Sequence, residues 1–185
     1  SLDYEKTLKS LARLAVPFLG DLCIVDIVEN GAVRRITVAC GDPAREEQVR
    51  QLHDRYAPDL NGPHPAMKVL RTGVAQLVPE ITDEDLVSAT QDAEHLQSVR
   101  EMGFKSYVIV PLLVRGRVLG AISLVSIQEG RRYGSADFAL AEELARRAVL
   151  SIENGQLYRE TQEATENLRQ AILILGEQQQ QLRTL

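Results

Sequence analysis

Two cysteines and three histidines are the side chains that could carry nucleophilic or metal chemistry in this chain. Cys23 and Cys40 lie in apolar, β-like stretches, so we expect two small buried residues, and two cysteines are too few for a disulfide scaffold. His53, His64 and His95 are scattered, without the paired cysteine or carboxylate spacing of a metal site. Serine-triad, P-loop and HExxH patterns are absent. We therefore expect no catalytic residue, no metal and no cofactor.

Composition and charge also exclude some classes of binding partner. The 185 residues carry a net charge of −5, and aromatic residues make up 4% with no Trp. A nucleic-acid surface would need a basic face or stacking aromatics, so nucleic acid is not an expected partner. No apolar run reaches the ~20 residues that cross a membrane, and no signal peptide is visible. These patterns predict a cytoplasmic domain without direct membrane contact.

Periodicity and turn residues predict an α+β fold. The expected order is a helix, two strands, two helices, a strand, a helix, two strands and a long helix: 2–15, 22–28, 33–40, 43–56, 66–71, 74–79, 82–102, 106–114, 117–126 and 135–185. Asn30-Gly31 favours a hairpin turn, because both positions tolerate a positive φ, and Arg115-Gly116 joins a second hairpin. Consecutive hairpin strands indicate an antiparallel sheet.

Apolar side chains show how the elements should pack. Both faces of the strand 106–114 are mainly apolar, so helices should cover both sides of the sheet. Two helical stripes should supply part of that cover, namely Tyr4, Leu8, Leu11 and Leu14 in the first helix and Leu140, Leu144, Ala148 and Ile152 in the last. Pro111 within a strand indicates a bulge or a strand end. Ser135 is a candidate helix cap, with Asp137 in the first turn.

The last helix is too long for one globular domain. About 50 residues at ~1.5 Å each span ~75 Å. Leu168, Leu175 and Leu182 recur every seven residues, with Ala171 and Leu185 in d-like positions, which is typical of a coiled coil. We expect the helix to leave the body near Tyr158 and to form a parallel homodimer through these leucines, with the first helix adding to the interface. The predicted organisation is a globular domain over 1–158 and a helical connector over 159–185.

Three segments together resemble the GAF domain family: 12–40 (ARLAVPFLGDLCIVDIVENGAVRRITVAC), 103–126 (GFKSYVIVPLLVRGRVLGAISLVS) and 131–158 (RRYGSADFALAEELARRAVLSIENGQLY). The last segment is most similar to GAF domains of bacterial sensor histidine kinases and of stressosome-type, STAS-linked regulators. The resemblance covers about 2–158, although 41–102 fits by element order alone. It implies that the terminal helices share one face of the sheet, with a small-molecule pocket on the other.

Known GAF subclasses imply residues that can be checked. Cyclic-nucleotide binders carry an Asn-Lys pair, a Phe and an Asp-Glu pair, of which only Asp137 matches outright and Tyr133 conservatively. Bilin attachment needs a pocket cysteine, and none follows Cys40. Haem would need a histidine ligand, for which His64 and His95 lie in a suitable region. Methionine sulfoxide reductase members place their cysteines around the pocket, which neither cysteine here matches.

The resulting hypothesis is a non-enzymatic regulatory domain that senses a small, largely apolar molecule and dimerises, as in a sensor histidine kinase of a two-component system. The alternatives are a structural dimerisation module without a ligand in a STAS-type regulator, and a GAF-type methionine sulfoxide reductase. The dimer residues would be Leu168, Leu175 and Leu182. The predicted pocket residues are Val78, Val99, Met102, Phe104, Ser106, Val108, Val110, Ile122 and Leu124.

Overall fold

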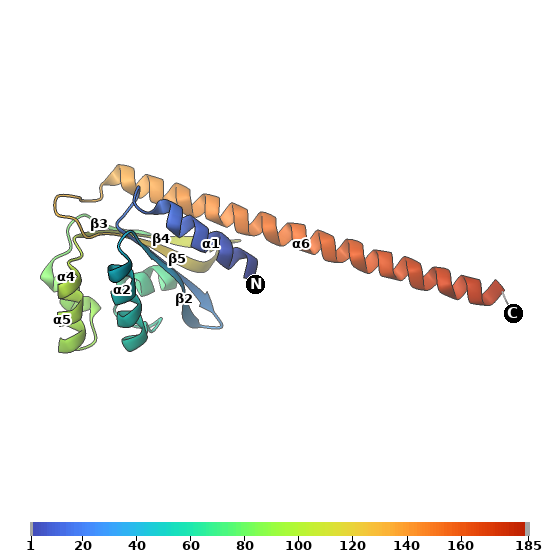
Figure 1. The fold of residues 1–185 in the computed structure, drawn as a ribbon, viewed down its shortest axis with the longest axis horizontal. Helices are drawn as coiled ribbons and strands as arrows, with labels where there is room; N and C mark the ends of the chain where they lie inside the picture. Colours follow the sequence, from blue (N-terminus) through green and yellow to red (C-terminus); the bar gives the residue numbers. More distant parts are fainter. Residues whose placement is uncertain (1, 184–185) are drawn as a thin grey trace.

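The computed structural model describes residues 2–183, and its centre is a five-stranded antiparallel sheet in the order β2-β1-β5-β4-β3. Helices α1 and α6 cover one face, and α2, α4 and α5 lie on the other (Figure 1). The elements are α1 (Leu2–Ala15), β1 (Leu22–Glu29), β2 (Ala32–Cys40), α2 (Pro43–Arg55), α3 (Pro65–Thr72), β3 (Gln76–Val78), α4 (Asp83–Ala89), α5 (Ala93–Met102), β4 (Ser106–Val114), β5 (Arg117–Ser126) and α6 (Ser135–Arg183). The predicted α+β class is confirmed.

Both predicted hairpins form at the predicted turns. Asn30 and Gly31 have φ values of 52° and 76°, and Arg115 and Gly116 have 51° and 76°. Two successive positive φ angles give the tight turn whose twist matches that of paired strands. A register irregularity follows Leu112, next to the position where Pro111 indicated a bulge.

The largest buried cluster lies between the sheet and the two terminal helices. From the helices it takes Tyr4, Leu8, Ala12 and Ala15 of α1 and Ala141, Ala145, Ala148 and Ile152 of α6. The predicted stripes were therefore partly wrong, because Leu14 and Leu140 are exposed. Several of the residues that face the sheet are alanines instead, which lets the helices approach it closely, while Leu14 and Leu140 point outward.

The segment 82–102 forms two helices, so the prediction of one continuous helix was wrong. Thr90 adopts an extended backbone between α4 and α5, and its hydroxyl donates back to the Leu86 carbonyl. Asp92 then caps α5 by accepting the His95 N–H at 2.8 Å. Side chains of Thr and Asp compete with the backbone ladder in this way, which ends one helix and starts the next. Thr82 and Asp85 form a capping box at the start of α4.

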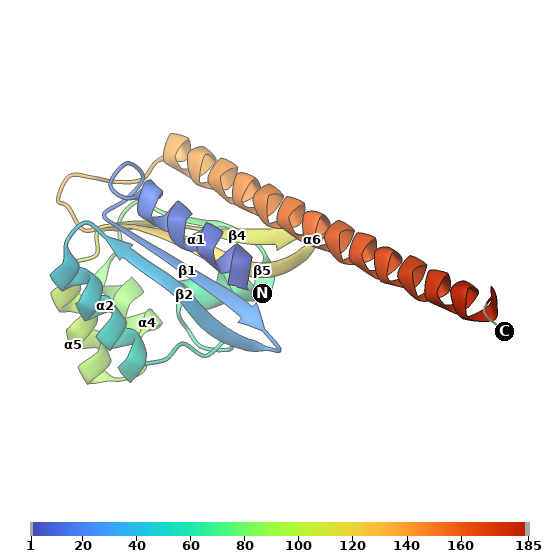
Figure 2. The same ribbon diagram turned by 45° about the vertical axis from the view of Figure 1, so that its right-hand side comes forward.

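Helix α6 begins on the sheet and then extends away from the body (Figure 2). Its first turn is capped by Gly134, whose carbonyl accepts the Phe138 N–H and whose N–H donates to Asp137, so Ser135 is not the cap. From Glu160 to Arg183 every residue is exposed. Leu185 lies outside the described residues. Within residues 2–183, no helix has the length and apolar character needed to span a bilayer.

Candidate functional site

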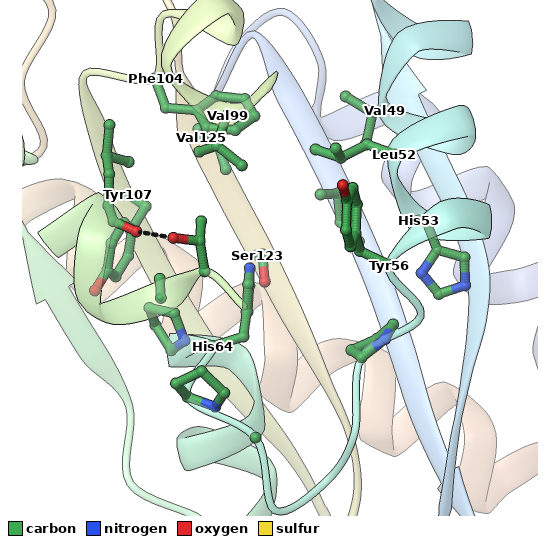
Figure 3. A pocket seen from close by; sticks show the side chains of 18 of the residues that line it. Val49, Leu52, His53, Tyr56, His64, Val99, Phe104, Tyr107, Ser123 and Val125 are labelled. Carbon is green, nitrogen blue, oxygen red and sulfur yellow. Dashed lines mark hydrogen bonds between the residues drawn. The ribbon is translucent and has the colours of Figure 1, made fainter. Parts of the chain in front are cut away.

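A cavity of about 160 Å³ lies on the sheet face opposite α1 and α6. Strands β1, β2, β4 and β5 form its floor, α2 forms one wall, and the loop 58–65 and helices α4 and α5 close it. Figure 3 shows Val99, Phe104 and Val125 grouped at one end of the cavity and His64 at the other. The cavity therefore has an apolar end and a polar end.

An ion pair is built into the floor at the polar end. Asp26 and Arg35 are direct cross-strand partners at a register shift between β1 and β2. Arg35 donates to both carboxylate oxygens of Asp26, at 2.8 and 3.3 Å, and the Asp26 side chain is only 1% exposed. This bidentate geometry satisfies the buried carboxylate. The backbone is also tight here, because a Cβ on Gly120 would lie 2.3 Å from the Asp26 carbonyl oxygen.

Two histidines in the closing segments face the cavity as neutral rings. The His64 Nδ1 caps α3 by accepting the Ala66 N–H at 3.1 Å, and the His95 Nδ1 accepts the Gln91 N–H at 3.1 Å. The remaining proton of each neutral ring must then sit on Nε2. Burial lowers the pKa of both rings, that of His64 to about 4, with Arg35 adding to the effect on His64. His64 lines the cavity, and by accessible surface it is an exposed residue, so solvent also reaches its side chain.

Helix α2 and its C-cap residue supply two more ring side chains to the cavity wall. Tyr56 stacks on His95 with ring centroids 4.2 Å apart and planes 6° apart, which fixes the orientation of His95. The Nδ1 atom of His53 is buried without a hydrogen-bond partner, and burial lowers the pKa of this ring. Ser123 of β5 adds a nearly buried hydroxyl on the floor.

The structure separates the nine predicted pocket residues. Val99 and Phe104 line the cavity, and the other seven do not. Val108, Val110, Ile122 and Leu124 point to the opposite face, into the core beneath α1 and α6. Their alternate neighbours Tyr107, Ile109, Ser123 and Val125 form the floor instead. Both sets are mainly apolar, so side-chain alternation could not identify the face of the sheet on which the cavity lies.

The remaining three predicted residues, Val78, Met102 and Ser106, do not line the cavity and have other roles. Met102 is buried in a cluster with Leu22, Val38, Val49 and Val125 beside the cavity. Ser106 is fully buried, and its hydroxyl donates to the Val78 carbonyl at 3.0 Å while accepting the Tyr133 N–H at 3.0 Å.

The sequence analysis did not predict Asp26 and Arg35 as cavity residues. The signal that could have identified them is a charged residue inside an otherwise apolar strand.

Polar contacts connect the cavity to the start of α6. Ile81, which lines the cavity, donates its N–H to the Lys105 carbonyl at 2.9 Å, and the Lys105 N–H donates to the Ser126 carbonyl at 2.8 Å. The Ser126 hydroxyl then donates to the Arg131 carbonyl at 3.2 Å. Together with Ser106, these bonds tie β3 and the segment before α4 to the loop that leads into α6.

Neither cysteine faces the cavity. Cys23 is buried in the core on the opposite face, where burial raises the pKa of its thiol to about 12. Cys40 is half-buried at the end of β2, and both thiols are free. Within residues 2–183, no group of three or more His, Cys, Asp or Glu side chains is placed to hold a metal ion.

Comparison with known proteins identifies the fold. A model of the GAF domain family matches residues 3–152. The structure is similar to a GAF/HD domain protein of Geobacter sulfurreducens, with 19% identity over 84% of this chain and 95% of that chain and a TM-score of 0.61. It is also similar to a domain of a putative two-component sensor histidine kinase of Sinorhizobium meliloti 1021, with 14% identity over 85% and 96% and a TM-score of 0.57.

A similar fold also occurs in a GAF domain whose structure was solved in a photoproduct state. The third domain GAF3 of Slr1393 from Synechocystis sp., solved in its photoproduct state, has 13% identity over 86% of this chain and 99% of that chain, with a TM-score of 0.62. No curated protein matches the chain. The family match covers most of the sequence and the architecture agrees with it, so this chain belongs to the GAF domain family.

Proposed function

We propose that this chain is a regulatory sensory domain that binds a small molecule in the cavity and transmits binding to α6. The main support for this proposal is the cavity itself, which has a volume of about 160 Å³ and lies between an apolar end and a set of polar side chains. Protein interiors are normally filled, and clefts that combine apolar walls with a few converging polar groups are typical ligand sites.

The cavity can be tested by filling it. Thermal-shift and native mass-spectrometry screens of metabolites are expected to identify a ligand for the unmodified protein. Val99→Phe adds a ring at the apolar end and should abolish binding of that ligand while the protein stays folded. The matched control is Val87→Phe, on exposed surface outside the cavity lining, which should bind as before. Unchanged binding by the Val99 variant would contradict the assignment of the site.

We further propose that α6 forms a parallel two-chain coiled coil. Leu168, Leu175 and Leu182 are 63%, 61% and 74% exposed and recur at the heptad spacing, so a second helix would bury them. Leu14 and Phe18 are also exposed, and they line a groove between α1 and the first part of α6. A paired connector would carry a change in one sensor to a paired output along one axis.

For the output, we propose a cytoplasmic sensor of the histidine kinase type, supported by the likeness to the S. meliloti sensor kinase domain and by two free cysteines. The alternative, a ligand-free dimerisation module of a STAS-type regulator, is favoured by the small cavity, since ligand pockets commonly enclose ~300–1,000 Å³. If α6 continues into a further domain, a phospho-acceptor helix there would favour the first proposal and a β-rich domain the second.

Catalysis is not part of the proposal, because neither thiol lies at the cavity and the Cys23 thiol is held protonated by burial. Methionine sulfoxide reductase activity should therefore be absent from the unmodified protein. An activity abolished by Cys23→Ser or Cys40→Ser would contradict this.

A further inference from the structure

The polar end of the cavity offers hydrogen-bond donors that the protein does not use. His64 and His95 both line the cavity, both use Nδ1 to accept a backbone N–H, and both therefore carry a proton on Nε2. A charge on the His95 ring would lower the pKa of His64, which places the two side chains near one another. Stacking against Tyr56 holds the His95 ring in place. Both side chains line the cavity from the segments that close it, so a ligand there that accepts a hydrogen bond could satisfy these two N–H groups.

The charges around the cavity disfavour an ion inside it. Asp26 and Arg35 neutralise one another through a bidentate contact, so neither is free to pair with a charged ligand. The other acids in the lining, Asp59 and Asp85, are exposed at the mouth and accept backbone N–H groups there. An anion would meet these carboxylates on entry, and a cation would find no unpaired carboxylate inside. A buried charge without a partner is strongly unfavourable.

Volume and shape limit the ligand further. An apolar cavity of ~150 Å³ accommodates benzene, so about 160 Å³ admits one ring with a short substituent, roughly ten non-hydrogen atoms. Val49, Val99, Phe104 and Val125 supply apolar walls for that ring. A cyclic nucleotide is about twice too large for this volume, and a linear tetrapyrrole is larger still.

We propose that the cavity binds a neutral, single-ring or similarly compact molecule whose carbonyl-type oxygen accepts hydrogen bonds from the Nε2–H groups of His64 and His95. This inference rests on the proposed sensory function and specifies its ligand class. The ring lies against Val99 and Phe104, and the oxygen points to the end occupied by His64.

Three probes of one size separate the parts of this proposal. Acetophenone has the ring and a neutral carbonyl, α-methylstyrene replaces the oxygen by a methylene group, and benzoate carries a negative charge. Titrations of the intact 185-residue chain by ligand-observed NMR should show acetophenone binding about tenfold more tightly than either of the others, the effect of one buried hydrogen bond that is otherwise unmet. Benzophenone, with a second ring, should not bind.

The variant His64→Asn tests the donor without removing the helix cap. Asn is a good N-cap residue, so its side-chain oxygen can still accept the Ala66 N–H, while the ring Nε2–H is lost. We expect an unchanged melting temperature, an unchanged affinity for α-methylstyrene and a preference for acetophenone reduced to about twofold. The α-methylstyrene affinity serves as the internal control for an intact cavity.

The outcomes distinguish this inference from the sensory function itself. Benzoate binding more tightly than acetophenone, or equal affinities for acetophenone and α-methylstyrene, would overturn the ligand class and leave the cavity as a binding site. Charged hits alone in the metabolite screen would do the same. No binding by any probe or metabolite would overturn the sensory function as well.

Discussion

The buried hydroxyl of Ser106 should stabilise the contact between the cavity edge and the start of α6, and removing it tests that role. In Ser106→Ala the Val78 carbonyl loses one donor and the buried Tyr133 N–H loses its acceptor. A typical hydrogen bond contributes about 1 kcal/mol net, and a buried group left unsatisfied costs about 1–3 kcal/mol. The free energy of unfolding should therefore fall by about 2–4 kcal/mol.

Ser126 provides a matched control. It is the direct cross-strand partner of Ser106, and both residues are 0% exposed. Its hydroxyl donates one bond, to the Arg131 carbonyl on a partly exposed residue that water can reach. Ser126→Ala should therefore cost about 1 kcal/mol.

Urea denaturation at one fixed protein concentration measures both variants, because any dimer makes the apparent stability concentration-dependent. Each kcal/mol should lower the melting temperature by roughly 2–4 °C for a domain of this size. Equal losses in the two variants would refute the reasoning, since they would show that the acceptor role of Ser106 toward Tyr133 adds nothing.

Three further outcomes are expected. Asp26→Asn should destabilise the protein by about 3–5 kcal/mol by leaving Arg35 without its buried partner, whereas Asp26→Leu combined with Arg35→Met should recover most of the loss in the same urea titrations. The free energy of unfolding should fall as the pH drops from about 6.5 toward the His64 pKa of about 4, because His64 binds a proton more readily in the unfolded chain than in the folded protein. Solvent access to the ring limits this loss to about 1–2 kcal/mol. The variant His64→Asn should reduce the slope of stability against pH in that window. Leu168→Asp, Leu175→Asp and Leu182→Asp together should give a folded monomer by sedimentation equilibrium, and an unmodified chain that is already monomeric at roughly 100 μM would refute the coiled coil.

The turns and strands could be predicted because their signals are local. Asn30, Gly31 and Gly116 tolerate positive φ angles whatever the rest of the chain does, and both hairpins form there. The break between α4 and α5 was missed because the acidic and amphipathic pattern continues across it. Asp92 decides the break through its own contact with the His95 N–H, and that competition is not visible in periodicity.

The cavity was harder to predict than the fold. A strand that is apolar on both faces does not reveal which face meets the terminal helices, so Val108 and Val110 could not be told apart from Tyr107 and Ile109 by pattern. The pairing of Asp26 with Arg35 also depends on the register irregularity between β1 and β2, and no turn residue in the sequence indicates that irregularity. Only the assembled sheet places this pair beside His64.

The arrangement of layers constrains how a ligand could influence α6. The cavity and α6 lie on opposite faces of the sheet, and the side chains between them, such as Val110 and Ile122, are close-packed and apolar. Packed apolar contacts are non-directional, whereas hydrogen bonds break when their geometry changes. The bonds from Ile81 to Lys105 and from Tyr133 to Ser106 run around the β3 side of the sheet to the loop before α6. A ligand that moves α4 would therefore act on α6 through this edge rather than through the core, and Ser106→Ala should weaken that coupling while leaving ligand affinity nearly unchanged.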